Sequence, residues 1–479
     1  MGDEVAKSGF VFTIGLTGHR DIHLEAVADI RAALRNELEA LRERFAALPV
    51  ELVTGLAQGA DTLATEVALE IGLPVRAVLP MPRALYEADF EGAAHSDLIR
   101  LLNDARVKVQ ELPLPSGTVE DDCKDGASRD ALYARLMDYL VRRSNVLVAL
   151  WDGEVTGLTG GSSDVVVRYL SGSEPQSRQA RKLEAVGDAE LADDRSDLAI
   201  WIKAPRQAGE VAQGDVQTSY LVQAGATGLI CRLPDIPDFV EERWREFDQY
   251  AIERDTETGA DLTAYPISTP DDIKISEVAS SIDVDFVRAD QLAIANQRQS
   301  DRLFKLFGLM AALMGLTFLL YAKIAALKLF LIAYVALFAG GFILFAIGSR
   351  RGWFGRHLAF RALAEALRIR FFLVLSGGGA TGQTRRLFRL TGIERFKGFG
   401  WIGDAIRCTE PLTYESTVPA NERVAAVSER WVKDQAAYFS RKHHQLHGEH
   451  ERLETVKKFL FLAAFLGAVS LLLFKKSLY

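Results

Sequence analysis

The pattern of apolar and polar positions divides the chain into a first half of short alternating runs and a second half with long apolar runs. Two of the long runs, Leu306–Ala322 and Leu329–Gly348, contain no charged side chain and are separated by six residues. As a helix, the second run would extend about 30 Å, which matches the hydrocarbon core of a bilayer. The two runs therefore predict a transmembrane helical hairpin with spans at residues 306–322 and 329–348.

A third apolar run, Phe459–Phe474, is a further candidate span, although its 16 residues are short for one. An interfacial helix and half of a second hairpin are the alternatives for this run. Upstream of the hairpin, Val278–Leu303 has helical character and contains no Pro or Gly. This segment is expected either to continue into the first span as one rigid helix or to form a separate surface helix.

In the first 235 residues, short apolar runs alternate with helical patterns. The candidate strands are Phe10–Leu16, Val50–Val53, Val75–Leu79, Val107–Leu112, Asn145–Trp151, Leu198–Lys203 and Leu229–Cys231, and the candidate helices are Leu24–Phe45, Thr62–Ile71 and Leu132–Arg142. This alternation predicts an α/β fold with a Rossmann-like, doubly wound and mostly parallel sheet. Ligands of such sheets bind beyond the carboxyl ends of the strands.

Shifts in composition predict the domain organisation. Residues 1–235 are expected to form the sheet domain, residues 236–277 a connecting helix and linker, and residues 278–479 an all-α membrane domain. Within the sheet domain, residues 171–197 are rich in Ser, Asp, Glu, Gln and Arg. This stretch is expected to be a mobile insertion.

Charge predicts the location of the protein. The net charge of −8 argues against nucleic acid as a partner, and three widely spaced cysteines fit a reducing compartment. No signal peptide opens the chain. Six basic residues flank the hairpin and two lie in its turn: Arg298, Arg302, Lys305, Arg350, Arg351 and Arg356, against Lys323 and Lys328. The positive-inside rule then predicts a multi-pass membrane protein with the N-terminal domain in the cytoplasm. The expected location is the cell inner membrane, with the lipid bilayer as a partner.

Three polar, glycine-bearing loops follow predicted strands and form the candidate ligand site. Glycines just before a helix start leave backbone N–H groups free for an anion, and His19 and Arg20 can add charge-assisted bonds to phosphate. For Asp61 and Asp164, the alternative is a structural role as helix N-caps. The candidate ligand-binding residues are Thr17, Gly18, His19, Arg20, Gly55, Gln58, Gly59, Ala60, Asp61, Thr62, Pro80, Asp152, Gly160, Gly161, Ser162, Ser163 and Asp164.

Three segments of these loops, Gly15–Arg20, Thr54–Asp61 and Gly160–Asp164, resemble the SLOG superfamily of Rossmann-like domains. The resemblance covers about residues 8–235, and the second segment is its most specific part. It implies binding of a nucleotide or a nucleotide-derived second messenger, such as a cyclic nucleotide or an ADP-ribose-like ligand. No other cofactor and no metal is expected.

One position departs from the enzymes of that superfamily. The LOG phosphoribohydrolases carry a PGGxGTxxE loop whose Glu is catalytic, and Val167 stands where that Glu would fall. A valine cannot act as a general acid or base, so binding is favoured over hydrolysis and no catalytic residue is assigned. Asp152 or Glu154 could substitute from another direction, which keeps hydrolysis open.

The second half of the chain resembles the SLATT type of two-spanning effector domains. The matching pieces are the hairpin 306–348, Phe360–Arg368, Arg430–Gln435 and the pair Tyr438-Phe439. The resemblance implies an oligomeric effector that forms a pore or disrupts the membrane. Four glycines in the spans would permit close helix packing: Gly308, Gly315, Gly340 and Gly341. A passive anchor is the alternative.

Four histidines lie close together near the end of the sequence: His443, His444, His447 and His450. Two of them are spaced i,i+4, as a helical metal site requires, but the pattern fixes no acidic third ligand. A polar helix near the membrane is therefore preferred to a metal site.

Together, the two halves predict a cytosolic sensor of a nucleotide-derived second messenger coupled to an oligomeric membrane effector. The setting implied by the resemblances is bacterial antiphage defence. The expected partners are further copies of the chain, with a tetramer favoured, and an associated enzyme that produces the signal. The alternatives are a membrane-tethered nucleotide-processing hydrolase and a receptor with a passive anchor.

Overall fold

The computed structural model describes residues 10–115, 117–154, 161–171, 185–186, 192–208, 216–224, 230–256, 267, 277–323, 327–376, 398–409 and 419–474. The chain divides into two compact units. The first comprises Met1–Val374 and Gly378–Glu415, and the second Leu375–Gly377 and Ser416–Tyr479. The predicted boundaries at residues 235 and 277 do not coincide with this division, because residues on both sides of them belong to the first unit.

The described strands of the first unit form one nine-stranded sheet in the order β4-β3-β2-β1-β5-β7-β8-β9-β6. Every pairing from β4 to β7 is parallel, whereas β7-β8 and β8-β9 are antiparallel and β6 pairs in parallel with β9. The prediction of a mostly parallel α/β sheet is therefore confirmed. The strands are β1 (Phe12–Gly18), β2 (Val50–Thr54), β3 (Val75–Leu79), β4 (Val107–Glu111), β5 (Val146–Trp151), β6 (Ala185–Val186), β7 (Ala199–Lys203), β8 (Thr218–Gln223) and β9 (Ile230–Leu233).

Helices cover both faces of this sheet, as the nearly continuous burial of β2 and β5 requires. Helix α1 packs on α2 and α2 on α4, whereas α5 packs on α6. The two groups lie on opposite faces because crossover connections are right-handed and the direction of strand addition reverses at β1. The helices and 3₁₀ turns of this region are η1 (Leu24–Ala26), α1 (Val27–Arg44), α2 (Ala60–Glu70), α3 (Arg83–Glu87), α4 (Gly92–Leu102), η2 (Glu120–Cys123), α5 (Gly126–Arg143) and α6 (Ser162–Ser171).

The predicted strands agree with the observed ones within about two residues, and the differences have local causes. Strand β8, with the sequence TSYLVQ, was not predicted because its polar and apolar residues form no continuous apolar run. Helix α5 begins six residues before the predicted Leu132. The predicted mobile insertion extends too far, since Ser196 and Asp197 at its end are buried. Residues 172–184 and 187–191 of that insertion lie outside the described residues, as does most of the predicted linker.

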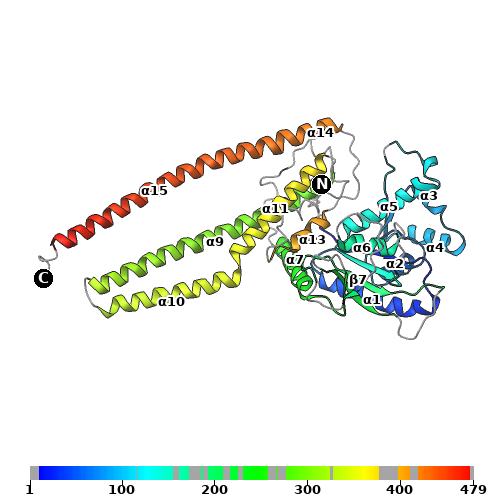
Figure 1. Cartoon of the computed structure of the whole chain (residues 1–479), viewed down its shortest axis with the longest axis horizontal. Coiled ribbons are helices and arrows are strands. Elements are labelled where there is room, and N and C mark those ends of the chain that lie inside the picture. The colour runs from blue at the N-terminus through cyan, green and yellow to red at the C-terminus, as the bar shows by residue number, and fades with distance from the viewer. Residues whose placement is uncertain are drawn as a thin grey trace, which may run out of the picture. The chain divides into compact units, whose positions relative to one another are not determined.

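The hairpin begins with one uninterrupted helix, α9 (Glu277–Lys323), which confirms that the upstream helical segment continues into the first apolar run. Helix α10 (Lys328–Arg351) runs back along α9 (Figure 1). A Cβ on Gly348 would lie 2.4 Å from a methyl carbon of Leu303, whereas a Cβ on Gly315 would meet nothing within 4 Å. Among the described residues, two helices that contain this hairpin are long and apolar enough to cross a membrane, and their apolar stretches are not buried. They suggest a membrane association.

Two helices of the first unit join the base of the hairpin to the sheet. Helix α7 (Asp238–Thr256) packs against α13 (Trp401–Cys408), and Phe360 of α11 (Trp353–Ser376) lies against both through Tyr250 and Trp401. Residues 398–409, expected in a separate membrane domain, thus lie in the same compact unit as the sheet.

The second unit, described by itself, contains α14 (Ala420–Val427), a π-helical stretch η6 (Ser428–Lys433) and α15 (Asp434–Phe474), besides the last two residues of α11. The third apolar run lies at the end of α15. That this run is helical is confirmed, whereas its crossing of a membrane stays a prediction.

Candidate functional site

The order of the sheet reverses between β1 and β5, and in open α/β sheets ligands bind at such a switch point. The loop after β1 carries His19, and the loop after β5 carries Asp152. The backbone N–H of His19 donates to the carbonyl of Leu150 at 2.9 Å, which holds the first loop on β5. Nε2 of His19 lies 3.1 Å from the backbone nitrogen of Asp152 and 3.0 Å from its Oδ1. The same ring nitrogen can therefore accept from the N–H when His19 is neutral or donate to the carboxylate when it is protonated.

The loop after β2 is fitted tightly against the loop after β1. Gly59 has a φ of +82°, and a Cβ there would lie 2.4 Å from the carbonyl oxygen of Arg20. The N–H of Ala60 donates to the carbonyl of His19 at 2.9 Å. On the other side, a Cβ on Gly18 would lie 2.4 Å from that of Ala60. The structure thus brings the first two predicted loops and Asp152 together at one edge of the sheet.

Asp61 is not the N-cap of α2, because the helix begins at Ala60 and Gly59 holds the cap position. The buried carboxylate of Asp61 turns back into its own loop. Its Oδ2 accepts from the hydroxyl of Thr54 at 2.8 Å and from the backbone N–H of Ala57 at 3.2 Å. Burial raises the pKa of Asp61 to about 6, and these hydrogen bonds oppose the rise. Asp61 therefore organises the loop from within.

The rest of the second loop divides into structural and exposed positions. Thr62 donates its hydroxyl to the carbonyl of Ala57 at 3.1 Å, so its side chain closes the loop. Leu56 has a φ of +55° and is the one non-glycine residue of the described chain with a positive φ. Such strain persists where the surrounding structure enforces it, often at functional sites. Gln58 is exposed, whereas Pro80, after β3, is buried.

Arg20 is the exposed cation of this edge. Its guanidinium carbon lies 5.8 Å from the ring centroid of Tyr133, and Arg20 makes no ion pair with any residue that the structure describes. The hydroxyl of Tyr133 donates to Asp89, which also pairs with Arg129 at 2.6 Å. Burial and the carboxylate of Asp89 raise the pKa of Tyr133 to about 12, so this hydroxyl remains a donor at neutral pH.

Tyr133 and Asp89 were not predicted as parts of the site. Tyr133 lies in α5 and Asp89 in the turn after α3, and the sequence of neither segment gives a signal of its position. Only the packing of α5 beside the first loop brings Tyr133 to Arg20. Thr17, another predicted site residue, is buried at the end of β1.

The third predicted loop is described only in part, since Gly160 lies outside the described residues. Helix α6 starts at Ser162, so Asp164 lies within its first turn and is not the N-cap. Its carboxylate accepts a hydrogen bond from Arg168 at 3.1 Å. Ser163 is buried. Val167 packs against the core formed with β5 and β7, and it therefore has a structural role whatever the ligand.

No cluster of three or more His, Cys, Asp or Glu side chains that could hold a metal ion occurs within the described ranges. His443 and His447 stack with their ring centroids 6.1 Å apart on exposed helix α15. No protein-family model matches the chain, and no curated protein is significantly similar to it. The resemblances to SLOG and SLATT domains therefore stay hypotheses from the sequence.

Proposed function

We propose that the chain is a cytoplasmic sensor of a nucleotide-derived second messenger that controls a membrane effector. The observation that carries the proposal is the convergence of two glycine-bearing loops, after β1 and β2, next to the switch point between β1 and β5, with exposed Arg20 in the first of them. An exposed guanidinium next to an aromatic ring suits a phosphorylated ligand with a stacking base. Candidates of this class are cyclic nucleotides and ADP-ribose-like molecules.

The proposal extends to the membrane through the connection of the two regions. The hairpin α9–α10 begins and ends in helices that pack in the same unit as the sheet. A ligand can shift the hairpin only if it binds the open and closed states with different affinities. In the proposed arrangement, copies of the chain assemble in the cell inner membrane, with a tetramer favoured, and ligand binding opens an ion path or permeabilises the bilayer. Antiphage defence, with an associated signal-producing enzyme, is the proposed setting.

A second candidate function, nucleotide hydrolysis, is favoured by one observation. His19 and Asp152 lie 3.0 Å apart at the switch point, and such a pair can act as a general base with a carboxylate that orients it. Mass spectrometry of nucleotides incubated with the purified protein separates the candidates. Intact ADP-ribose and cyclic AMP support a sensor, and product formation lost in His19→Ala supports the hydrolase.

The binding site is tested with Gly59→Glu. The new side chain would meet the carbonyl of Arg20 and add negative charge, so binding of ADP-ribose and cyclic AMP should disappear. Gly72→Ala is the matched control, because Gly72 also has a positive φ but its Cβ would meet nothing within 4 Å. Unchanged affinity in a folded Gly59→Glu variant would mean that the ligand does not bind at this edge of the sheet.

A further inference from the structure

The long helix of the second unit carries large apolar side chains at a constant spacing of seven residues. This heptad row begins in η6 and continues along α15, and each of its residues is between 51% and 68% exposed. The heptad row consists of Val432, Phe439, Leu446, Leu453 and Leu460. Two positions after its first four members, on the opposite side of the helix, the residues are polar or small: Asp434, Arg441, Gly448 and Thr455. The heptad row therefore forms an apolar stripe along one side of the helix.

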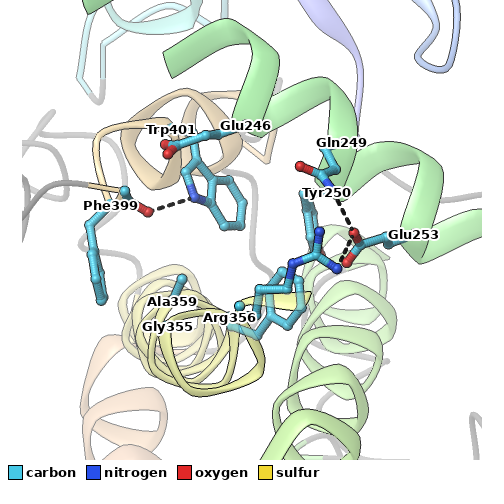
Figure 2. A pocket seen from close by; sticks show the side chains of 12 residues that line it. Glu246, Gln249, Tyr250, Glu253, Gly355, Arg356, Ala359, Phe399 and Trp401 are labelled. Carbon is cyan, nitrogen blue, oxygen red and sulfur yellow. Dashed lines mark hydrogen bonds and ion pairs between the residues drawn. The ribbon is translucent and has the colours of Figure 1, made fainter. Parts of the chain in front are cut away.

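Apolar side chains at the base of the hairpin cover one another, unlike those of the heptad row. Tyr250 of α7 and Trp401 of α13 are buried, with their ring centroids 4.8 Å apart (Figure 2). A bilayer does not account for the exposure of Phe439, Leu446 and Leu453, because they precede the third apolar run. They are interleaved with charged residues: Arg441, Lys442, Glu449, Glu451, Arg452 and Glu454. An exposed apolar stripe of this kind marks an interaction surface.

The spacing of the heptad row indicates that its partner is another helix. On a straight α-helix, positions seven residues apart drift around the axis by about 20° per repeat. From Val432 to Leu460 this drift would reach about 80°. Two helices that wind around each other with a left-handed twist remove the drift, which is why a sustained seven-residue repeat is typical of coiled coils.

The polar residues beside the heptad row favour a second copy of the chain as that helix. Four positions after its first four members, where a seven-residue repeat also faces the partner, lie Ala436, His443, His450 and Lys457. In parallel copies in register, each histidine faces its own equivalent. A neutral imidazole has one donor and one acceptor nitrogen, so two facing imidazoles can satisfy each other, whereas an apolar partner would leave both without hydrogen bonds. Lys457 lies 3.0 Å from Glu454 of its own chain.

We propose that the heptad row forms the seam of a parallel coiled coil between copies of this chain, with His443 and His450 setting its register. Polar groups in a seam fix register and strand number at a cost in stability. A seam weakened in this way suffices for copies held in one membrane, because tethering raises their effective concentration. The parallel direction rests on the proposed membrane location, since α15 ends in the third apolar run. The contact itself does not rest on nucleotide binding.

Disulfide cross-linking of full-length protein in membranes tests the seam. In a parallel coiled coil in register, Leu446→Cys places two cysteines face to face, so mild oxidation should give a covalent dimer. The matched control is Thr455→Cys, at an exposed position on the opposite side of the helix, which should give about a tenth of that dimer or less. The native cysteines can stay, since all three are buried: Cys123, Cys231 and Cys408.

A second substitution in the Leu446→Cys protein measures the strength of the contact. Leu453→Gln removes an apolar contact of the seam, so the protein density that gives half-maximal dimer should rise about tenfold. Tyr438→Gln removes another exposed large side chain of α15, outside the heptad row, and should leave this density unchanged. Circular dichroism checks that both variants keep their helix content.

Three outcomes would overturn the proposal. Leu446→Cys would give no dimer if the heptad row packs against the hairpin of its own chain or against lipid. Equal dimer yields from Leu446→Cys and Thr455→Cys would show that collision, and not a seam, joins the copies. Equal effects of Leu453→Gln and Tyr438→Gln would remove the special role of the heptad row. Because cross-linking needs no nucleotide, this inference can fail while the proposed sensor function stands.

Discussion

The two edges of the parallel sheet are built in opposite ways. At the carboxyl edge, exposed Arg20 lies beside a strained loop that holds Leu56 at a φ of +55°. At the amino edge, buried charges are closely paired: Arg407 donates to the carbonyl of Ser144 at 2.6 Å and lies 2.7 Å from Asp197. One edge keeps polar groups available, and the other uses them internally to attach α13.

Strands β1 and β5 connect the two edges directly. Asn145, just before β5, accepts from the N–H of Thr13 at 3.0 Å and donates to the carbonyl of Asp404 in α13 at 2.8 Å. At the other end of β5, Asp152 contacts His19. The comparison shows that the proposed ligand site lies little more than the length of one strand from the contacts that attach the base of the hairpin. Variants at the amino edge should therefore affect stability, and variants at the carboxyl edge should affect ligand binding.

The largest effect is expected for Arg407→Met. It removes a buried guanidinium from Asp197 and should lower the free energy of unfolding by about 3–5 kcal/mol, measured by urea denaturation in detergent. The control is Arg206→Met, which removes an exposed pair with Asp21 at 3.1 Å and should cost at most about 1 kcal/mol. Similar losses in both variants would mean that the amino edge is not specially stabilised by this pair.

At the carboxyl edge, Arg20→Ala should have the reverse profile. If Arg20 pairs with a ligand phosphate, affinity for the bound nucleotide should fall by about 1.5–3 kcal/mol, measured by calorimetry. The free energy of unfolding should be unchanged, since Arg20 is exposed. A loss of affinity below a few tenths of a kcal/mol would assign Arg20 no part in binding.

Asp61 gives the carboxyl edge its own pH dependence. Because burial raises its folded-state pKa to about 6, the folded protein binds a proton that the unfolded chain has already released. The contribution of Asp61 to stability is therefore greatest below pH 4 and is lost as the pH rises to about 6, by roughly 1–3 kcal/mol. In Asp61→Asn this fall should be missing from urea denaturation curves measured between pH 4 and 7. An identical pH profile in the variant would contradict the claim that the buried carboxyl group of Asp61 causes this fall in stability.

The hairpin offers a smaller comparison between two of its glycines. Gly348→Leu should open the packing of α9 against α10, because Leu303 already fills the space beside Gly348, at a cost of about 1–3 kcal/mol. Gly315→Leu should leave the hairpin intact and impair assembly of copies if Gly315 faces another chain. Thermal unfolding and the mass of the assembly in detergent measure the two effects. If both variants behaved alike, the packed position of Gly348 and the open position of Gly315 would have no different roles in the hairpin.

The sequence predicted the parallel sheet and the hairpin because each rests on local patterns: apolar runs such as that of β5, and two uncharged stretches separated by a short turn. It also predicted that glycine-bearing loops follow β1 and β2. It did not predict the role of Asp61, since a side chain that turns back to Thr54 and Ala57 is determined by loop geometry. Nor did it predict that Arg407 would pair with Asp197, because that contact joins segments more than two hundred residues apart.

The most direct test of the sensor account is ion flux from liposomes that contain the full-length protein. ADP-ribose and cyclic AMP are added to wild-type protein and to Arg20→Ala, with empty liposomes as the background. The account predicts flux only after addition of one of these ligands, and a shift of its half-maximal concentration by about tenfold or more in Arg20→Ala. Ion flux that does not depend on the ligand would contradict the account. So would the absence of flux from liposomes whose protein has bound the ligand.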